Sequence, residues 1–196
     1  ADGDFRRLSR VLAGLESSGA ASLVIRSTHV SGVWWRQIPK GADVYHEPSE
    51  PADNRWQRGA SIDALYFADE PATVWAEWYR SASESGIPPS SLLPRDLWQW
   101  DISLPVVADL RAPELRADLG LPEPMMPTRR QWSPFQALGE QLYETGWSAL
   151  LSPSAARPSG LVLCVFRPAR TVPGAKPLPP PATIADPPIV PTGMQT

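Results

Sequence analysis

Cysteine and histidine are scarce in this sequence of 196 residues, and each shortage argues against a class of protein or site. Cys164 is the single cysteine, so no internal disulfide can form, and its place in an apolar run predicts an inert, buried side chain. The two histidines, His29 and His46, give poor support to a zinc site or a Ser-His-Asp triad. We therefore expect no metal and no prosthetic group.

Motifs that would indicate a common activity are absent as well. The sequence has no phosphate-binding loop and no glycine fingerprint for dinucleotides. No apolar run approaches the roughly 18 to 20 residues that cross a bilayer, and the polar segment 1–10 does not resemble a signal peptide. A net charge of -3 without a basic run argues against general binding of nucleic acid. These absences predict a cytoplasmic protein without a membrane span.

Arginine and proline are the residues in excess. Of the 18 basic residues only Lys40 and Lys176 are lysine, a bias that genomic base composition can cause, although arginine is also the residue that grips phosphate with a rigid fork. The 24 prolines gather in loops and after Pro168, where the chain should be extended and unable to form a core. We predict one folded domain over residues 4–170 and a proline-rich tail over residues 171–196.

The apolar pattern predicts an α+β fold. Asp69 and Pro71 are suited to begin a helix, and Ser133 combines a capping-box spacing with proline at the next position, so its helix is the best marked of the chain. Helices are expected over residues 4–19, 72–85, 113–119 and 133–146. Strands are expected over residues 22–25, 33–38, 64–68, 98–102, 105–110, 147–151 and 160–167.

Five polar residues at the edges of these elements are candidates for a functional site. Arg36 lies within a predicted strand, and Arg55 ends a long loop. Tyr66 lies in the next strand, Glu77 on the aromatic helix after it, and Ser154 in a turn-like segment. Together they would supply a carboxylate, two cations and two hydroxyl groups.

Each candidate also has an ordinary structural interpretation. Composition favours a solvated helix flank over a pocket for Glu77, and Arg36 could equally lie over apolar surface with its charge in water. Tyr66 would usually be a core aromatic, and Ser154 a turn residue.

Two near neighbours compete with these candidates. Arg58 is as plausible as Arg55 in the same loop, and Ser152 is the nearest competitor of Ser154. Composition and spacing alone leave both choices open.

The order of these residues resembles the RES-domain family, toxins of bacterial toxin-antitoxin pairs that are named for Arg, Glu and Ser. Each matching piece is short, and the resemblance lies in their order and intervals over residues 33–167. The pieces are Trp35-Arg36, Arg55-Trp56 with Gly59, Leu65-Tyr66-Phe67-Ala68, Ala76-Glu77, and Pro153-Ser154 within residues 146–166.

The resemblance implies a fold similar to ADP-ribosyltransferases, with two small mixed sheets flanked by helices. Family members degrade NAD, some as phosphorylases that release nicotinamide and leave ADP-ribose 1″-phosphate, and a few ADP-ribosylate a metabolic enzyme instead. Transfer residue by residue makes Arg36, Arg55, Tyr66, Glu77 and Ser154 the NAD pocket, with Arg36, Tyr66 and Glu77 as catalytic residues. NAD would be a substrate, with inorganic phosphate or water as the second reactant, so no cofactor is implied.

The chemistry agrees with these residue types. Breaking the bond between nicotinamide and ribose builds positive charge on the sugar, so the site needs a carboxylate near that sugar and cations on the pyrophosphate. With the resemblance added, we prefer Glu77 in a pocket, and Arg55 over Arg58.

The resemblance also implies a protein partner, and some positions of this sequence differ from the family pattern. It implies a small helical antitoxin of the Xre/DUF2384-like type whose C-terminus enters the pocket. Gln37 stands where many relatives carry an aromatic residue, and Gln57 stands where asparagine is common. Protein ADP-ribosylation remains an alternative, and so does a non-catalytic binding module whose proline-rich tail recruits aromatic grooves.

Overall fold

The computed structural model describes residues 25–45, 53–59, 61–122 and 128–195. The helix expected over residues 4–19, most of the strand expected over residues 22–25, and His46 lie outside the described residues.

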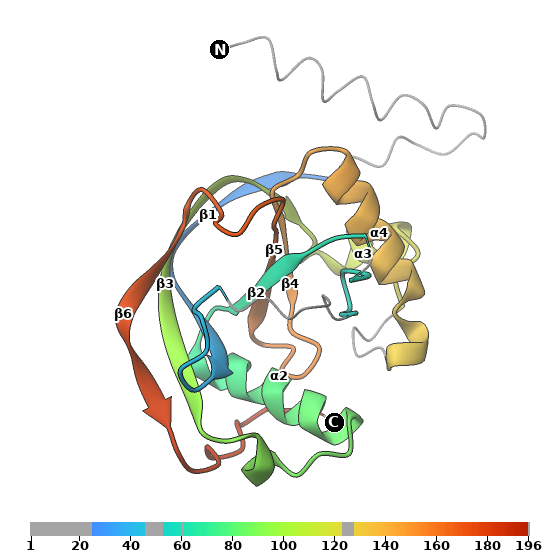
Figure 1. The fold of residues 1–196 in the computed structure, drawn as a ribbon. Helices are drawn as coiled ribbons and strands as arrows, with labels where there is room; N and C mark the ends of the chain where they lie inside the picture. The colour runs from blue at the N-terminus through green and yellow to red at the C-terminus, as the bar shows by residue number, and fades with distance from the viewer. Residues whose placement is uncertain (1–24, 46–52, 60, 123–127, 196) are drawn as a thin grey trace, which may run out of the picture.

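The strands form one sheet, not two. In the order β1-β2-β5-β4-β3-β6 each strand pairs with the next, and β1 also pairs with β3, so the first five close into a barrel and β6 lies outside it (Figure 1). All pairings are antiparallel except that of β3 with β4. The strands are β1 (Ser27–Pro39), β2 (Ala64–Ala68), β3 (Arg95–Asp109), β4 (Ala149–Pro153), β5 (Leu161–Phe166) and β6 (Ala175–Ile184).

The expectation of two small sheets is wrong because β3 is much longer than its sequence suggests. The 15 residues of this strand cover both segments in which separate strands were expected. One edge of β3 pairs with β1, and the other pairs with β6 near its start and with β4 near its end. Pro105 lies where the β1–β3 register shifts, and a bulge tolerates its missing N–H.

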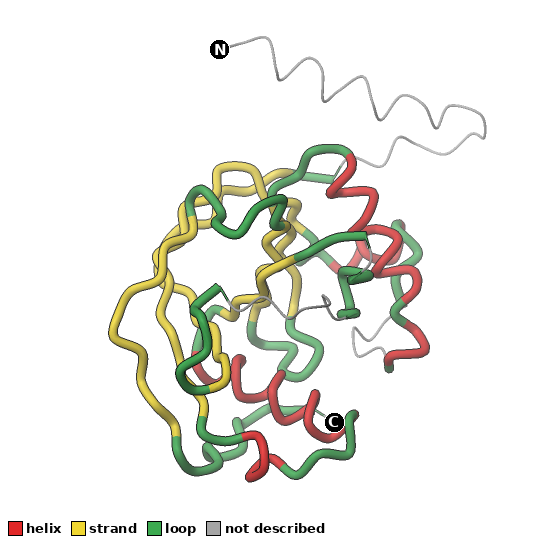
Figure 2. The backbone as a smooth tube through the Cα atoms, viewed as in Figure 1, coloured by secondary structure: helices red, strands yellow, loops and turns green. Residues whose placement is uncertain are grey.

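The helices lie outside the barrel, as the tube in Figure 2 shows. α2 and α4 begin with proline in their first turn and confirm the two helices that the sequence marks best. The capping box expected at Ser133 is wrong, because that residue is already helical and the box joins Thr128 to Gln131 one turn earlier. The elements are α2 (Pro71–Glu84), α3 (Pro113–Asp118), α4 (Ser133–Glu144) and the 3-10 turns η2 (Pro89–Leu92) and η3 (Arg129–Gln131).

Three apolar clusters hold the domain together. The first lies between the barrel strands and includes Trp34, Phe67 and Trp100. A second packs α4 against the sheet through Phe135, and a third packs α2 against it through Trp78. Because side chains alternate along a strand, Phe67 enters the first cluster while its neighbour Tyr66 faces the other side of β2.

The proline-rich tail is extended, but it belongs to the folded unit. β6 pairs with β3, and Val172 and Ala175 are buried in the first cluster, so the chain beyond residue 170 contributes a strand and core residues to the sheet. The sequence suggested otherwise because proline cannot donate to a ladder, yet an edge strand has one side that needs no donors. Beyond β6 the chain turns back along α2, where the Tyr79 hydroxyl donates to the carbonyl of Pro188 (Figure 1).

Within the described residues, no helix is long and apolar enough to cross a membrane. The same residues contain no group of three or more side chains that could hold a metal ion.

Candidate active site

A cavity of about 610 Å³ lies between α2, the ends of β1 and β2, and the turn η3. Its size is in the range of about 300 to 1,000 Å³ that is usual for small-molecule sites. Four of the five predicted residues line it: Arg36, Arg55, Tyr66 and Glu77. The fifth, Ser154, is buried beside the cavity and contacts Glu77.

Glu77 is held from behind by three donors. The Ser154 hydroxyl donates to its Oε1 at 2.6 Å, and the backbone N–H groups of Ala155 and Ala156 donate to the same oxygen at 2.9 and 3.3 Å. Ser154 is itself fixed, because its Oγ accepts from the N–H of Arg157 at 3.0 Å. The carboxylate therefore has one anchored oxygen, while Oε2 accepts no hydrogen bond from the residues that the structure describes. The sequence left two positions open for Glu77, a solvated flank of its helix or a pocket, and in the structure Glu77 lines the cavity.

Arg55 reaches the cavity from its loop. Its Nη2 donates to Ser152 Oγ at 3.3 Å and to the carbonyl of Pro153 at 3.2 Å, and its guanidinium lies 5.2 Å from the ring centroid of Trp56. Burial lowers the pKa of Arg55, and the nearby Glu77 opposes that shift.

The two competing residues have other roles. Arg58 does not line the cavity and forms an ion pair with Glu140 on α4. Ser152 supports Arg55, while Ser154 supports Glu77, so each serine serves a different side chain of the cavity.

Arg36 lines the cavity and has one guanidinium nitrogen without a partner in the part of the chain that the structure describes. Its Nη1 atom is buried and has no hydrogen-bond partner among the described residues. Burial lowers the pKa of Arg36 to about 10, and repulsion from Arg167 adds to the shift, which Asp63 opposes. A buried guanidinium without a partner is costly, and an anionic ligand would remove that cost. Arg36 is thus not a simple surface residue, and it forms no ion pair with another residue that the structure describes.

Tyr66 combines both interpretations considered for it. Its ring packs beside the α4 cluster and lines the cavity, while its hydroxyl accepts the N–H of Trp56 at 3.3 Å. Burial raises the pKa of Tyr66 well above its usual value, and contact with Cys164 raises it further. The neutral hydroxyl therefore fixes the backbone next to Arg55.

The sequence interpretation missed several residues of the cavity wall. Arg80 lies one turn after Glu77 on the same face of α2 and donates to the carbonyl of Ala155 at 2.7 Å. That three-residue spacing was the available signal. Arg95, Arg129 and Trp132 also line the cavity, and their sequence surroundings contain no such signal.

The departures from the family pattern are accommodated. Gln37 Oε1 accepts from Arg95 Nε at 2.5 Å, so it orients an arginine of the cavity. Gln57 is buried and donates to the carbonyl of Ile62 at 3.3 Å, which fixes the loop that carries Arg55.

Cations outnumber anions in the wall of the cavity. Five arginines and three acids line it, so an anionic ligand is favoured over a cationic one. The arginines are Arg36, Arg55, Arg80, Arg95 and Arg129, and the acids are Asp63, Glu77 and Glu84.

A model of the RES domain family matches residues 33–184. The chain belongs to the RES domain family. Among solved structures, this RES domain is similar to the crystal structure of the M. tuberculosis MbcT-MbcA toxin-antitoxin complex, with a TM-score of 0.68 and 21% identity over 81% of this chain and 87% of that one. At that identity the likeness shows a shared fold. No curated protein matches the sequence. The family match includes β6, in agreement with its place in the sheet.

Proposed function

We propose that this RES domain is a toxin that breaks the nicotinamide–ribose bond of NAD and so depletes the cell of NAD. One observation carries the proposal. A carboxylate, Glu77, is fixed through one oxygen inside a cavity whose wall also carries Arg36 and Arg55. A carboxylate stabilises the charge that develops on ribose, and guanidinium groups bind phosphate, so the two requirements of the reaction meet in one place.

The proposed reaction is a substitution at the ribose carbon. The bond from C1″ to the nicotinamide nitrogen breaks, and its electron pair leaves with nicotinamide. The free Oε2 of Glu77 stabilises the positive ribose and holds a ribose hydroxyl. An oxygen of inorganic phosphate, or of water, then bonds to C1″. Phosphate yields ADP-ribose 1″-phosphate, and water yields ADP-ribose with loss of a proton.

The other residues bind and orient the substrate. Arg36 and Arg55 hold the pyrophosphate or the incoming phosphate, because both are cations of the cavity wall, Arg55 buried and Arg36 half-buried. Tyr66 lines the cavity beside Arg55 and positions the nicotinamide ribose. Ser154 does not touch the substrate in this scheme, since its hydroxyl is used to orient Glu77.

A protein partner is part of the proposal. One solved structure with a similar fold is that of a toxin-antitoxin complex. By analogy we propose a cognate antitoxin of the Xre/DUF2384-like type that enters the cavity and controls the toxin in the cytoplasm. A terminal carboxylate or an acidic segment would suit the arginine-rich wall.

The decisive experiment is mass analysis of the products formed from NAD by purified, folded protein, with and without inorganic phosphate. We expect nicotinamide in both cases and ADP-ribose 1″-phosphate when phosphate is present. ADP-ribose alone would indicate hydrolysis, and label transferred from NAD to a protein would indicate ADP-ribosylation. Intact NAD under all these conditions would contradict the proposed activity and favour a non-catalytic binding module.

A further inference from the structure

The cavity extends well beyond Glu77, along α2 to the end of that helix. Arg129 lies at this far end, where its Nη2 donates to Ser85 Oγ at 3.2 Å and its Nε lies 3.9 Å from Glu84. Ser85 follows Glu77 by about two turns of helix, which corresponds to roughly 12 Å at 1.5 Å per residue. The far wall is thus separated from the carboxylate by a distance that a single nucleoside would not fill.

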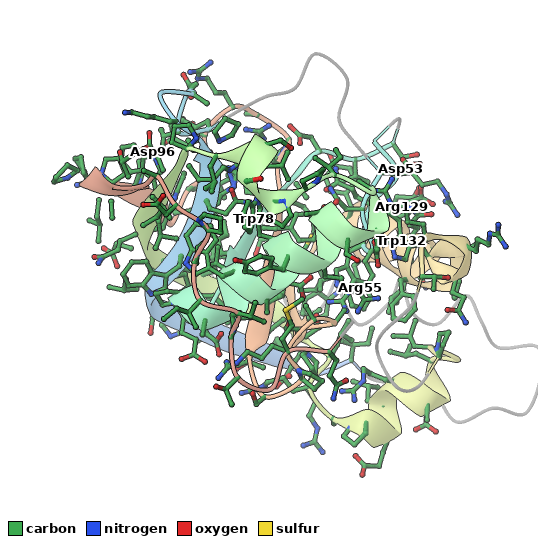
Figure 3. The ribbon with its side chains drawn as sticks, turned by 90° about the horizontal axis from the view of Figure 1, so that it is seen from below. Asp53, Arg55, Trp78, Asp96, Arg129 and Trp132 are labelled. Atoms are coloured by element: carbon green, nitrogen blue, oxygen red, sulfur yellow. The ribbon has the colours of Figure 1, made fainter. Side chains whose placement is uncertain are left out.

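The far wall offers a flat, aromatic surface. Trp132 is half-buried and lines the cavity, and the guanidinium of Arg129 lies 5.6 Å from its ring centroid. Figure 3 shows the two side chains together, at the opposite end of the molecule from Asp96. The turn η3 that carries Arg129 is fixed, because the Thr128–Gln131 capping box closes it. An indole ring and a guanidinium plane are the groups on which nucleic-acid bases stack.

Cationic side chains occupy the stretch between the two ends. Arg55 and Arg80 lie near Glu77, and the charge of Arg80 contributes to the lowered pKa of Arg55, after the larger effect of burial. A ligand that reaches from Glu77 to Trp132 therefore passes first a carboxylate, then guanidinium groups and finally an aromatic face. This order matches a ribose, a pyrophosphate and a second base.

We propose that Arg129 and Trp132 form the binding site for the adenine of the substrate, and that they make the enzyme select a dinucleotide over a mononucleotide. The inference rests on the proposed function, since it takes the bond to be broken to lie at Glu77. It adds the direction of the ligand along α2 and a reason for selectivity. Nicotinamide mononucleotide, which contains the same scissile bond, cannot reach the far wall.

Binding and turnover test this proposal separately. The binding probe is ADP, which contains adenine and pyrophosphate but no scissile bond, and pyrophosphate alone is its control. Trp132→Ala should weaken ADP binding about 10-fold or more and leave pyrophosphate binding unchanged. Trp132→Phe, which keeps an aromatic face, should restore most of the affinity. Arg130→Ala is the matched control, because Arg130 is exposed on the same turn and does not line the cavity.

In turnover, Trp132→Ala should lower kcat/KM for NAD about 10-fold or more, mainly through KM, and leave kcat/KM for nicotinamide mononucleotide unchanged. Equal losses for both substrates, or ADP binding that does not depend on Trp132, would overturn the adenine site while the proposed activity stands. If the wild-type protein binds ADP through Trp132 but leaves NAD intact, the adenine site is supported and the proposed NAD cleavage is contradicted.

Discussion

The two helices α2 and α4 pack on the same sheet, yet they bury different kinds of side chain. The buried residues of α4 carry no charge and are mostly apolar, with Phe135, Leu138 and Leu142 in the core and Gln136 as the polar exception. The inner face of α2 buries Trp75 and Trp78, but it also turns Glu77 and Arg80 toward the cavity. A charge on the packed face of a helix lowers stability unless it is paired, so such a charge indicates a site, while an apolar face indicates support.

α4 nevertheless supports the site from behind. Gln136 on this helix donates to the carbonyls of Asn54 and Gln57 at 3.1 and 3.2 Å, on both sides of Arg55. Gly139 lets the helix approach so closely that an added Cβ would lie 2.0 Å from the carbonyl oxygen of Trp56. The comparison thus separates a helix that places charged side chains in the cavity wall from a helix that fixes the loop carrying Arg55.

The largest effect expected is on activity, and it comes from α2. Glu77→Gln keeps the shape and can still accept the three hydrogen bonds, but it removes the charge that stabilises the ribose. We expect a loss of at least about 100-fold in NAD cleavage, with little change in Tm, and loss of toxicity on expression in bacteria. Glu114→Gln, at an exposed position of α3, is the control and should leave both unchanged. If the Glu77→Gln protein is still toxic, the Glu77 carboxylate is not needed for the toxic activity.

The next effect is on stability, and it comes from α4. Gly139→Ala should lower the free energy of unfolding by about 3 kcal/mol, because the new methyl group meets backbone and not a flexible side chain. Denaturant unfolding measures this loss, and Ala137→Ser, at an exposed position of the same helix, should change it little. An unchanged unfolding midpoint for Gly139→Ala would mean that α4 does not approach the Arg55 loop so closely.

Two serines allow a finer test of how each supports the site. Ser154→Ala removes a hydrogen bond to Glu77, so kcat for NAD should fall about 10-fold. Ser152→Ala removes a contact of Arg55, so KM should rise and kcat should change less. Steady-state kinetics separates the two constants. The same change in both variants would show that the turn acts as a unit and not through separate partners.

Arg36 should show opposite effects on stability and on binding. Because burial lowers its pKa, the folded state is penalised at every pH below about 10, where Arg36 is charged in both states, and less so at higher pH. Arg36→Met removes that charge and should raise the free energy of unfolding by about 1 kcal/mol while it weakens ADP binding. Urea unfolding and calorimetry measure the two quantities. A loss of stability in this variant would mean that Arg36 is paired in the free protein.

The smallest effect is expected at Cys164, in the cluster under α4. Burial raises the pKa of this thiol to about 12, so it stays protonated at neutral pH. Iodoacetamide at pH 8 should therefore not modify the folded protein, and NAD cleavage should be unaffected by the reagent. Modification should begin only as urea unfolds the chain. Rapid alkylation of the folded protein would contradict the packing of this side of the sheet.

The parts of the fold that the sequence predicts are those with local signals. β2, α2 and β5 follow from strand-like composition, from proline in a first turn and from a run that is apolar on both faces. The closure of the barrel depends on pairing between β1 and β3, residues that are far apart in the chain, and no short pattern contains it. β6 was missed because its prolines are unfavourable in most strands and acceptable in this one.

The site divides in the same way. Glu77 and Arg36 can be chosen from residue type and order, but their surroundings cannot. The three donors to Glu77 come from a turn more than seventy residues later in the chain, and the unpaired state of Arg36 depends on what lies around it in the fold. Trp132 lies outside the short segments that resemble the family pattern, so only its place in the cavity wall connects it to the other site residues.

The prolines of β6 have a consequence beyond the fold of one molecule. This strand is the open edge of the sheet, and an open edge can pair with an edge of another chain and start aggregation. Pro177, Pro179, Pro180 and Pro181 deprive this strand of four N–H donors, and Lys176 adds charge to it. The loss of donors and the added charge thus disfavour pairing of β6 with a strand of another chain. The residues that look least suited to a sheet are those that help to keep it from aggregating.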